Sequence, residues 1–295
     1  MFAPLEALRP KQWTKNLLLF VGVIFSQHLS DTALLQRAIA GFVAFSLLSG
    51  SVYVLNDLMD VEADRQHPKK CKRPIASGRL PVPLAWGMLP VILAAVGAIS
   101  WWLGPAFMTV AGIYLASNLA YSFWLKHKVI IDVFLIANGF MLRAIAGVEI
   151  IRQVQPDTLL SPWLLVCTFF GALFLGVSKR RRELANAGTH ASEQRAVLRR
   201  YTPELLEVML TVSASTTLMS YALYTMWPST VEKFGTDRLL YTVPFVAFGV
   251  FRYLYLVRVS ETSEDPSAVL LTDRPIQATV ALFLVAIVWV LYFAR

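Results

Sequence analysis

The residues best suited to chemistry lie between Asn56 and Gly78, at the end of a strongly apolar segment. Three carboxylates there, Asp57, Asp60 and Asp64, are spaced i, i+3 and i+7, so on a helix they lie on one face. Carboxylates on one face repel one another unless a cation neutralises them. Mg²⁺ commonly binds through one or two carboxylates together with substrate phosphates. The spacing therefore predicts a Mg²⁺ site.

Basic residues follow these carboxylates directly. Guanidinium and ammonium groups donate charge-assisted hydrogen bonds to phosphate oxygens, so the stretch predicts a Mg²⁺–diphosphate site at a membrane surface. The alternative is a solvated, charged loop between two membrane helices. The functional interpretation is favoured because the acidic residues begin inside an apolar helix, where ionisable groups are costly and usually functional. The binding residues predicted in this stretch are Asn56, Arg65, Lys69 and Arg73.

Composition places the chain among membrane proteins. It has 295 residues, of which 56% are hydrophobic, and its mean hydropathy of +0.56 is too high for a soluble domain. The net charge of +8 is explained by the distribution of charge among loops and by anionic substrates, so we expect no nucleic acid as a partner. Cys71 and Cys167 form neither a disulfide framework nor a metal-ligand pattern.

Apolar segments recur along the whole chain, and most approach the roughly 20 residues that a helix needs to cross a bilayer. We therefore expect an all-α, polytopic membrane protein with nine transmembrane helices in a single integral membrane domain, residues 1–295. Gly104 and Pro105 divide one long apolar run into two spans. The expected spans are about 14–28, 35–55, 82–102, 105–124, 129–150, 161–178, 204–226, 238–257 and 275–293.

Charge asymmetry orients these spans. With the N-terminus in the cytosol, 21 of the 27 Lys and Arg residues lie on the cytosolic side and five on the opposite side, while Arg143 lies inside a span. Cytosolic loops of membrane proteins carry such an excess of positive charge. We therefore expect a multi-pass membrane protein with a cytoplasmic N-terminus and an active site on the cytoplasmic side.

Three further groups of polar residues lie at expected cytosolic membrane boundaries or within the spans beside them. Lys15 and Asn16 precede the first span, where they either snorkel to the interface or contact the phosphate of a lipid substrate. Lys126 lies in the loop before the fifth span, where it can contact a phosphate. Asp132 and Arg143 are eleven residues apart on one face of that span, so they either pair with neighbouring helices or contact substrate.

The segment SKRRREL, residues 178–184, follows the sixth span. Its cations either set only the topology or bind a second anionic group. Lys179 and Arg182 lie on adjacent turns of a helix that leaves the membrane, which suits the second interpretation, and Glu183 is the acidic residue beside them.

The motif NDLMDVEAD resembles the first Asp-rich motif, NDxxDxxxD, of the UbiA-type intramembrane prenyltransferase superfamily. This resemblance covers essentially the whole chain and implies nine helices around a central cavity that opens to the cytosolic face. The superfamily usually has a second acidic motif, DxxxD, after the sixth span, whereas this chain has SKRRREL. The segment SKRRREL resembles the decaprenyl-phosphate phosphoribosyltransferase branch of the superfamily, together with the segments RPKQWTKN, HPKKCKRPIASG, YSFWLKH and LRAIAG.

The resemblance implies transfer of 5-phosphoribose from 5-phosphoribosyl 1-diphosphate to a polyprenyl phosphate, with Mg²⁺ as cofactor. The product would begin the synthesis of a polyprenylphosphoryl-arabinose for cell-envelope glycans, and the protein would lie in a bacterial inner (plasma) membrane. The sequence leaves oligomeric state open and is compatible with a membrane homo-oligomer. The expected roles are metal binding by Asp57, Asp60 and Asp64 with Asn56 beside them; diphosphate binding by Lys69, Arg73 and Lys126; 5-phosphate binding by Lys179 and Arg182; lipid-phosphate binding by Lys15 and Asn16; and further substrate contacts by Arg65, Tyr121 and Arg143.

Two other functions are considered beside this one. A Mg²⁺-dependent prenyltransferase that acts on a prenyl diphosphate and an aromatic or other acceptor would share Asp57 and Asp60, but it predicts the acidic second motif that is missing. A transporter or lipid-binding protein gives no reason for three carboxylates on one helical face. Asp60→Asn distinguishes a metal-dependent enzyme from a transporter or lipid-binding protein, because the metal interpretation predicts loss of turnover with little change in the yield of folded protein.

Overall fold

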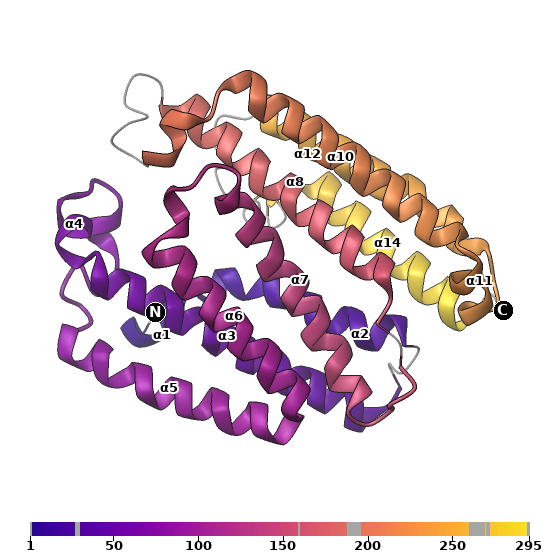
Figure 1. The fold of residues 1–295 in the computed structure, drawn as a ribbon, viewed down its shortest axis with the longest axis horizontal. Coiled ribbons are helices and arrows are strands. Elements are labelled where there is room, and N and C mark those ends of the chain that lie inside the picture. The colour runs from indigo at the N-terminus through magenta and orange to yellow at the C-terminus, as the bar shows by residue number, and fades with distance from the viewer. Residues whose placement is uncertain are drawn as a thin grey trace. The chain divides into compact units, whose positions relative to one another are not determined.

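The computed structural model describes residues 2–26, 30–158, 160–187, 196–259, 269 and 272–293. Within these ranges the chain forms helices and turns and no strand (Figure 1). It divides into two compact units. Unit 1 comprises residues 1–123 and 142–159, and unit 2 comprises residues 124–141 and 160–295. Helix α7, Ile131–Arg152, contributes residues to both. The single integral membrane domain expected from the sequence stays a prediction.

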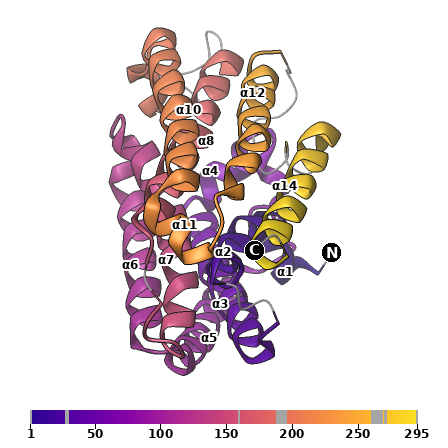
Figure 2. The same ribbon diagram turned by 90° about the vertical axis from the view of Figure 1, so that its right-hand side faces the viewer.

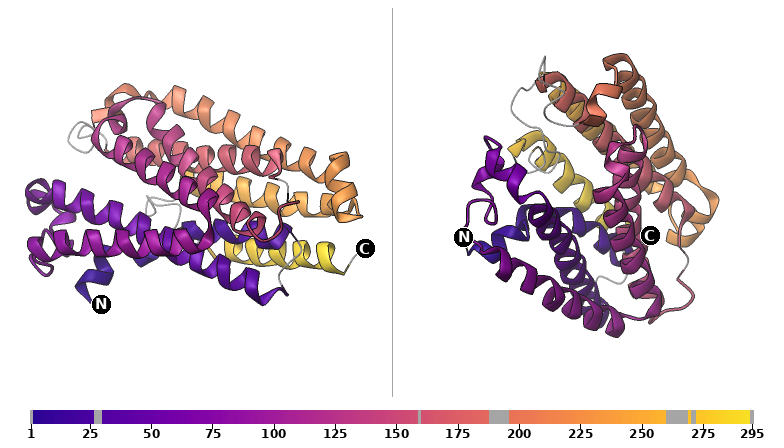
Figure 3. Two further views of the ribbon diagram at one scale, coloured as in Figure 1. Left: turned by 60° about the horizontal axis from the view of Figure 1, so that its bottom comes forward. Right: turned by 60° about the vertical axis from the view of Figure 1, so that its left-hand side comes forward.

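Unit 1 contains the N-terminal helices and the acidic motif. Its two long neighbouring helices, α3 and α5, lie side by side (Figures 1 and 3). Asp31 begins α3 because its carboxylate accepts hydrogen bonds from two backbone amides of the first turn. The elements are α1 Ala3–Ala7, η1 Pro10–Leu19, α2 Phe20–Phe25, α3 Thr32–Met59, α4 Val61–Gln66, η2 Lys70–Lys72, α5 Val82–Leu103, α6 Pro105–Phe123 and the last part of α7.

The turn between α5 and α6 lies where the sequence predicts it. Gly104 has φ +117°, a value that disfavours residues with a side chain, and Pro105 follows as the first residue of α6. Arg37 of α3 donates to the carbonyl oxygen of Leu103 at 2.7 Å, so a cation caps the end of α5. The division of this apolar run into two helices is therefore confirmed.

Close backbone contact holds α7 against the N-terminal segment of unit 1. A Cβ atom on Gly147 would lie 2.2 Å from the carbonyl oxygen of Leu19, and one on Gly22 would lie 2.5 Å from that of Gly147. Small residues permit such approach between membrane helices. Around this contact, Leu19, Phe45 and Ile150 are fully buried in one hydrophobic cluster.

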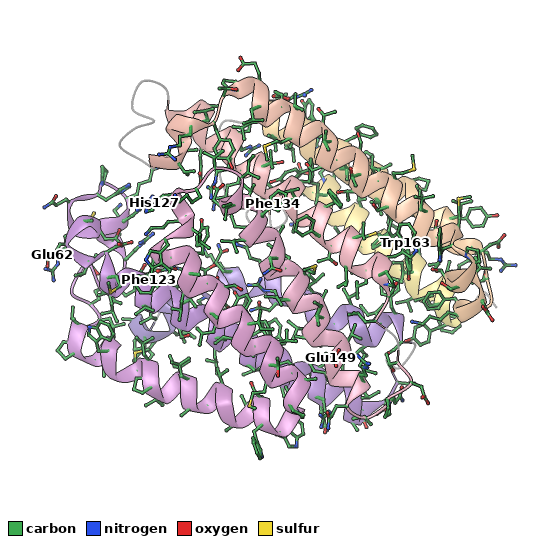
Figure 4. The ribbon with its side chains drawn as sticks, viewed as in Figure 1. Glu62, Phe123, His127, Phe134, Glu149 and Trp163 are labelled. Carbon is green, nitrogen blue, oxygen red and sulfur yellow. The ribbon has the colours of Figure 1, made fainter. Side chains whose placement is uncertain are left out.

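Unit 2 contains the remaining long helices. Helices α8 and α10 run side by side, and α12 packs against α14 (Figures 1 and 2). Phe134 of α7 packs edge-on against Phe169 of α8. Trp163 at the start of α8 packs in the same way against Trp227 at the end of α10 (Figure 4 labels Phe134 and Trp163). The elements are η3 Leu125–His127, the first part of α7, α8 Pro162–Ala187, η5 Ala196–Arg200, α10 Pro203–Met226, α11 Pro228–Phe234, η6 Arg238–Thr242, α12 Val243–Val259 and α14 Arg274–Tyr292.

Eight helices of the described ranges are long and apolar enough to cross a membrane. They correspond to the second to ninth spans expected from the sequence. The first expected span, about 14–28, is described as far as residue 26 and consists there of the short elements η1 and α2. Apolar side chains such as Val91, Phe251 and Val285 are largely exposed on the long helices, as lipid-facing residues would be. A ninth crossing, a central cavity and a cytosolic opening stay predictions.

Candidate active site

The acidic motif lies where α3 gives way to α4. Helix α3 ends at Met59, Asp60 connects the two helices with φ −99° and ψ 14°, and α4 starts at Val61. Hydrogen bonds from the Asp60 amide to Asn56 and from the Asp64 amide to Asp60 keep the backbone nearly helical through this junction. Asp57 and Asp64, seven residues or about two turns apart, therefore point to the same side.

One guanidinium group joins these two carboxylates. Arg73 Nη1 donates to Asp57 Oδ1 at 3.0 Å and to Asp64 Oδ2 at 2.5 Å. A second arginine, Arg9, donates through Nη2 to Asp57 Oδ1 at 2.6 Å, and Lys70 Nζ lies 3.7 Å from Asp64 Oδ1. Three cations, one from the N-terminal segment and two from the segment after α4, thus surround two carboxylates.

The two carboxylates are much more deeply buried than the arginine side chains that contact them. The side chains of Asp57 and Asp64 are 3% and 2% exposed, whereas those of Arg9 and Arg73 are 30% and 29% exposed. Two carboxylates within hydrogen-bonding distance of one nitrogen are close enough to share a small cation, and Mg²⁺ prefers such oxygen ligands and retains waters for the rest. This donor set fits Mg²⁺. Within the described ranges, no three His, Cys, Asp or Glu side chains form a metal-ligand group.

The other predicted residues of this stretch lie around the pair rather than in it. Asp60 is exposed, so the shared face expected from the sequence holds for Asp57 and Asp64 and does not extend to Asp60. Arg65 is exposed and pairs with Glu62, which lies on the outer side of α4 (Figure 4). Lys69 is exposed and Asn56 is partly buried. Their expected roles stay predictions.

A second network in unit 1 joins Asn16 and Arg143, which the sequence predicts as separate substrate contacts. Asn16 is fully buried; its Nδ2 donates to Ser46 Oγ at 3.0 Å, and its Oδ1 accepts from Arg143 Nε at 2.7 Å. Arg143 also donates to the phenolic oxygen of Tyr114 at 2.6 Å and lies over its ring. The network connects η1, α3, α6 and α7. Lys15, the residue before Asn16, is partly buried.

Unit 2 contains a buried ion-pair network at the ends of α7 and α8. Arg180 Nε donates to Asp132 Oδ2 at 2.6 Å and Arg180 Nη1 donates to Glu183 Oε2 at 2.5 Å, with Arg180 1% and Asp132 0% exposed. Tyr201 donates to Asp132 Oδ1 at 2.6 Å and accepts from the backbone amide of Ile130 at 2.7 Å. Burial and the hydrogen bond to Asp132 raise the pKa of Tyr201 well above its usual range, so the phenol stays a donor.

The predicted cations of unit 2 are placed differently from one another. Arg182 is 5% exposed, and its Nη2 donates to the carbonyl oxygen of Leu256 on α12. Lys179 is partly buried on the same helix, and Lys126 is partly buried in the η3 turn beside His127 (Figure 4). The Arg182 side chain of α8 is thus hydrogen-bonded to the backbone of α12. Phosphate binding by these three residues stays a prediction.

Tyr121, a further predicted substrate contact, is partly buried near the end of α6 in unit 1. Sequence reasoning missed Arg9 as a partner of the acidic motif. It also missed Arg180 and Tyr201 as the partners of Asp132. The separation of 48 residues between each arginine and its carboxylate leaves no local signal, although Arg9 opens the quoted motif RPKQWTKN.

The model of the UbiA prenyltransferase family matches residues 17–273. The chain belongs to this family. Among similar proteins is a decaprenyl-phosphate phosphoribosyltransferase of Mycolicibacterium smegmatis, 34% identical over 98% of this chain and 92% of that protein. Another, from Corynebacterium glutamicum, is 36% identical over 98% of this chain and 86% of that protein. The family and the apolar helices together make this UbiA-family chain a multi-pass membrane protein.

Solved structures agree with this assignment of the fold. A UbiA homolog from Archaeoglobus fulgidus bound to GPP and Mg²⁺ matches with a TM-score of 0.72 over 98% of this chain and 99% of that one, at 20% identity. A digeranylgeranylglyceryl phosphate synthase matches with a TM-score of 0.64 over 97% and 96% of the two chains, at 17% identity. The all-α, UbiA-like fold expected from the sequence is confirmed.

Proposed function

We propose that this UbiA-family protein transfers 5-phosphoribose from 5-phosphoribosyl 1-diphosphate to a polyprenyl phosphate and releases diphosphate. The observation that carries the proposal is the nearly full-length similarity, at 34% and 36% identity, to proteins named decaprenyl-phosphate phosphoribosyltransferase. Lys179 of the basic segment SKRRREL supports it, because a reaction with three phosphate-bearing groups requires more cations than transfer of a prenyl group to an uncharged acceptor. Arg180 and Arg182 of that segment have protein partners in unit 2.

The residues of unit 1 would bind the leaving diphosphate. Asp57 and Asp64 would hold Mg²⁺, and Arg73 would then be available to donate to diphosphate oxygens. A Mg²⁺ ion bound there supplies Lewis-acid stabilisation of the charge that the leaving diphosphate acquires. Both carboxylates are almost completely buried, so solvent screens the interaction between their negative charge and a bound cation only weakly.

The reaction itself replaces one bond at C1 of the ribose. The bond from C1 to the diphosphate oxygen breaks and its electron pair leaves with the diphosphate, while an oxygen of the polyprenyl phosphate forms the new bond from the opposite face. The lipid phosphate is already ionised at neutral pH, so no side chain has to remove a proton. Positioning and electrostatic stabilisation by the cationic side chains then account for most of the acceleration.

Asn16 and Arg143 are proposed to support the lipid phosphate from within unit 1. Their mutual hydrogen bond fixes both side chains, and Tyr114 holds the guanidinium from a third helix. Lys15, beside Asn16, would supply the direct charge. Phosphate binding by Lys126 and Lys179 of unit 2 is proposed from the sequence alone.

The positive-inside asymmetry supports a cytoplasmic N-terminus and a site on the cytoplasmic side of a bacterial inner membrane, where the soluble donor is available. The product, a polyprenyl-phosphoryl 5-phosphoribose, is a lipid-linked pentose. We propose that it serves cell-envelope glycan synthesis as a precursor of polyprenylphosphoryl-arabinose.

The test compares two substrate pairs on the purified protein in detergent with Mg²⁺. One reaction contains polyprenyl phosphate and 5-phosphoribosyl 1-diphosphate, and the other contains a prenyl diphosphate and 4-hydroxybenzoate. Mass spectrometry of the lipid fraction should show a phosphoribosylated lipid in the first reaction only, and a chelator should abolish it. A prenylated aromatic product in the second reaction alone would identify a conventional prenyltransferase and overturn the proposal.

A further inference from the structure

Arg9 contacts the acidic pair although it lies outside the acidic motif. Its Nη2 donates to Asp57 Oδ1 at 2.6 Å, the shortest contact that this carboxylate makes with its two arginine partners. Its guanidinium also lies 4.5 Å from the ring centroid of Tyr53, one turn before Asp57 on α3. The Arg9 backbone is left-handed, with φ 52° and ψ 65°, a conformation that residues other than glycine rarely adopt.

Contacts on both sides hold the backbone of Arg9 in that conformation. Leu8 is buried against Gly50, where an added Cβ would lie only 2.8 Å from Leu8 Cδ2. Trp13 Nε1 donates to the carbonyl oxygen of Leu8 at 3.1 Å. Glu6 forms a bidentate ion pair with Arg79, which lies between η2 and α5, at 2.7 and 2.8 Å. An unfavourable backbone conformation that its surroundings enforce is often found at functional sites.

The exposure of the two carboxylates and of their arginine partners indicates which ligands this site favours. The carboxylates of Asp57 and Asp64 are almost completely covered, and the side chains of Arg9 and Arg73 that contact them are about one-third exposed. A cation approaching from solvent meets positive charge first, whereas a diphosphate meets two guanidinium groups that it can bind. Metal alone is therefore repelled from the carboxylates, and metal together with diphosphate is favoured.

We propose that Arg9 is a diphosphate-binding residue that exchanges partners: it holds Asp57 while the site is free of metal, and it transfers to a diphosphate oxygen when Mg²⁺ takes its place on that carboxylate. This inference rests on the metal–diphosphate site of the proposed function. Arg73 makes the same exchange from Asp57 and Asp64. The site consequently binds its metal and diphosphate together, and binds either one alone only weakly.

The exchange predicts opposite effects of one substitution on two ligands. Removing the Arg9 side chain frees Asp57 from a competitor, so Mn²⁺ alone should bind about tenfold more tightly. Diphosphate, measured with Mn²⁺ saturating, should bind about tenfold more weakly because it loses one charge-assisted hydrogen bond. A side chain that only stabilised the fold would not shift the two affinities in opposite directions.

The experiment measures Mn²⁺ binding by electron paramagnetic resonance and inorganic diphosphate binding by calorimetry, on the purified protein in detergent. Two variants remove the side chain. Arg9→Ala removes it directly, and Arg9→Gly removes it while favouring the left-handed backbone, so a folding defect in the first is avoided in the second. Lys11→Ala is the matched control, because it removes an exposed cation two residues away and should change neither affinity.

Tighter Mn²⁺ and weaker diphosphate binding in Arg9→Gly would support the exchange. An unchanged or lower affinity for Mn²⁺ in Arg9→Gly, or a wild-type protein that binds no Mn²⁺ even with diphosphate present, would overturn it, and so would an unchanged affinity for diphosphate. Neither measurement requires turnover. A protein that passes this test but forms no phosphoribosylated lipid would therefore refute the proposed function and leave the exchange standing.

Discussion

Asp132→Asn should strongly destabilise the protein because Asp132 is the centre of the buried network in unit 2. Its carboxylate accepts from Arg180 Nε at 2.6 Å on one oxygen and from Tyr201 at 2.6 Å on the other. The amide of asparagine has nearly the same size, but it carries no charge and presents a donor to one of these two donors. Arg180, which is 1% exposed, would lose its fully buried partner.

The expected loss follows from this geometry. Removing one partner of a buried ion pair typically costs about 3–5 kcal/mol, because the remaining charge is left without compensation. Glu183 still accepts from Arg180 Nη1 in the variant, so we expect the lower end, about 3 kcal/mol. That is a large share of the roughly 5–15 kcal/mol by which folded proteins are stable.

The assay is equilibrium unfolding in mixed micelles of detergent and SDS, followed by the fluorescence of the eight tryptophans. Glu62→Gln is the matched control, an acid-to-amide change in an exposed ion pair. Glu62 pairs with Arg65 one turn away, and the two side chains are 78% and 48% exposed, so this substitution should cost less than about 1 kcal/mol. The reasoning fails if Asp132→Asn costs no more than the control.

Three further predictions concern other parts of the chain. The hydrogen bond from Arg252 lowers the pKa of Asp273 below its ordinary 3.8. The stability that this bond contributes is therefore present above about pH 4 and is lost as the pH falls through the pKa of Asp273 in the folded protein. Asp273→Asn should remove this dependence and so flatten the acid side of a curve of stability against pH. Gly147→Ala should destabilise by about 1–3 kcal/mol because the added Cβ meets a backbone carbonyl at 2.2 Å, whereas Gly112→Ala, with nothing within 4 Å, should leave the unfolding midpoint unchanged or slightly raised. The metal-ligand role that the resemblance implies for Asp60 predicts that Asp60→Asn abolishes turnover without moving that midpoint, since Asp60 is exposed; retained turnover would leave Asp57 and Asp64 as the metal ligands.

Local patterns predicted the helices and part of the acidic site. Gly104 and Pro105 end one helix and begin the next for reasons contained in two residues, a left-handed φ and a fixed φ. The seven-residue spacing of Asp57 and Asp64 places them together because it is close to two turns of a helix. The three-residue spacing of Asp60 leaves it about one-sixth of a turn away, and it is exposed.

Partners from distant segments could not be predicted in the same way. Asp132 and Arg143 share a face of α7, and the sequence could not decide between structural pairing and substrate contact. The structure gives each its own network: Asp132 pairs with Arg180, and Arg143 donates to Asn16. These choices depend on which helices pack nearby. Composition and spacing within one helix do not contain that information.

The central claim is that diphosphate leaves C1 and the remaining phosphoribose joins the lipid. The most direct test uses 5-phosphoribosyl 1-diphosphate with one radioactive label in the 5-phosphate and another in the diphosphate. With polyprenyl phosphate and Mg²⁺ present, the 5-phosphate label should pass into the organic phase while the diphosphate label stays in water. Both labels staying in water, or both entering the lipid, would contradict the account.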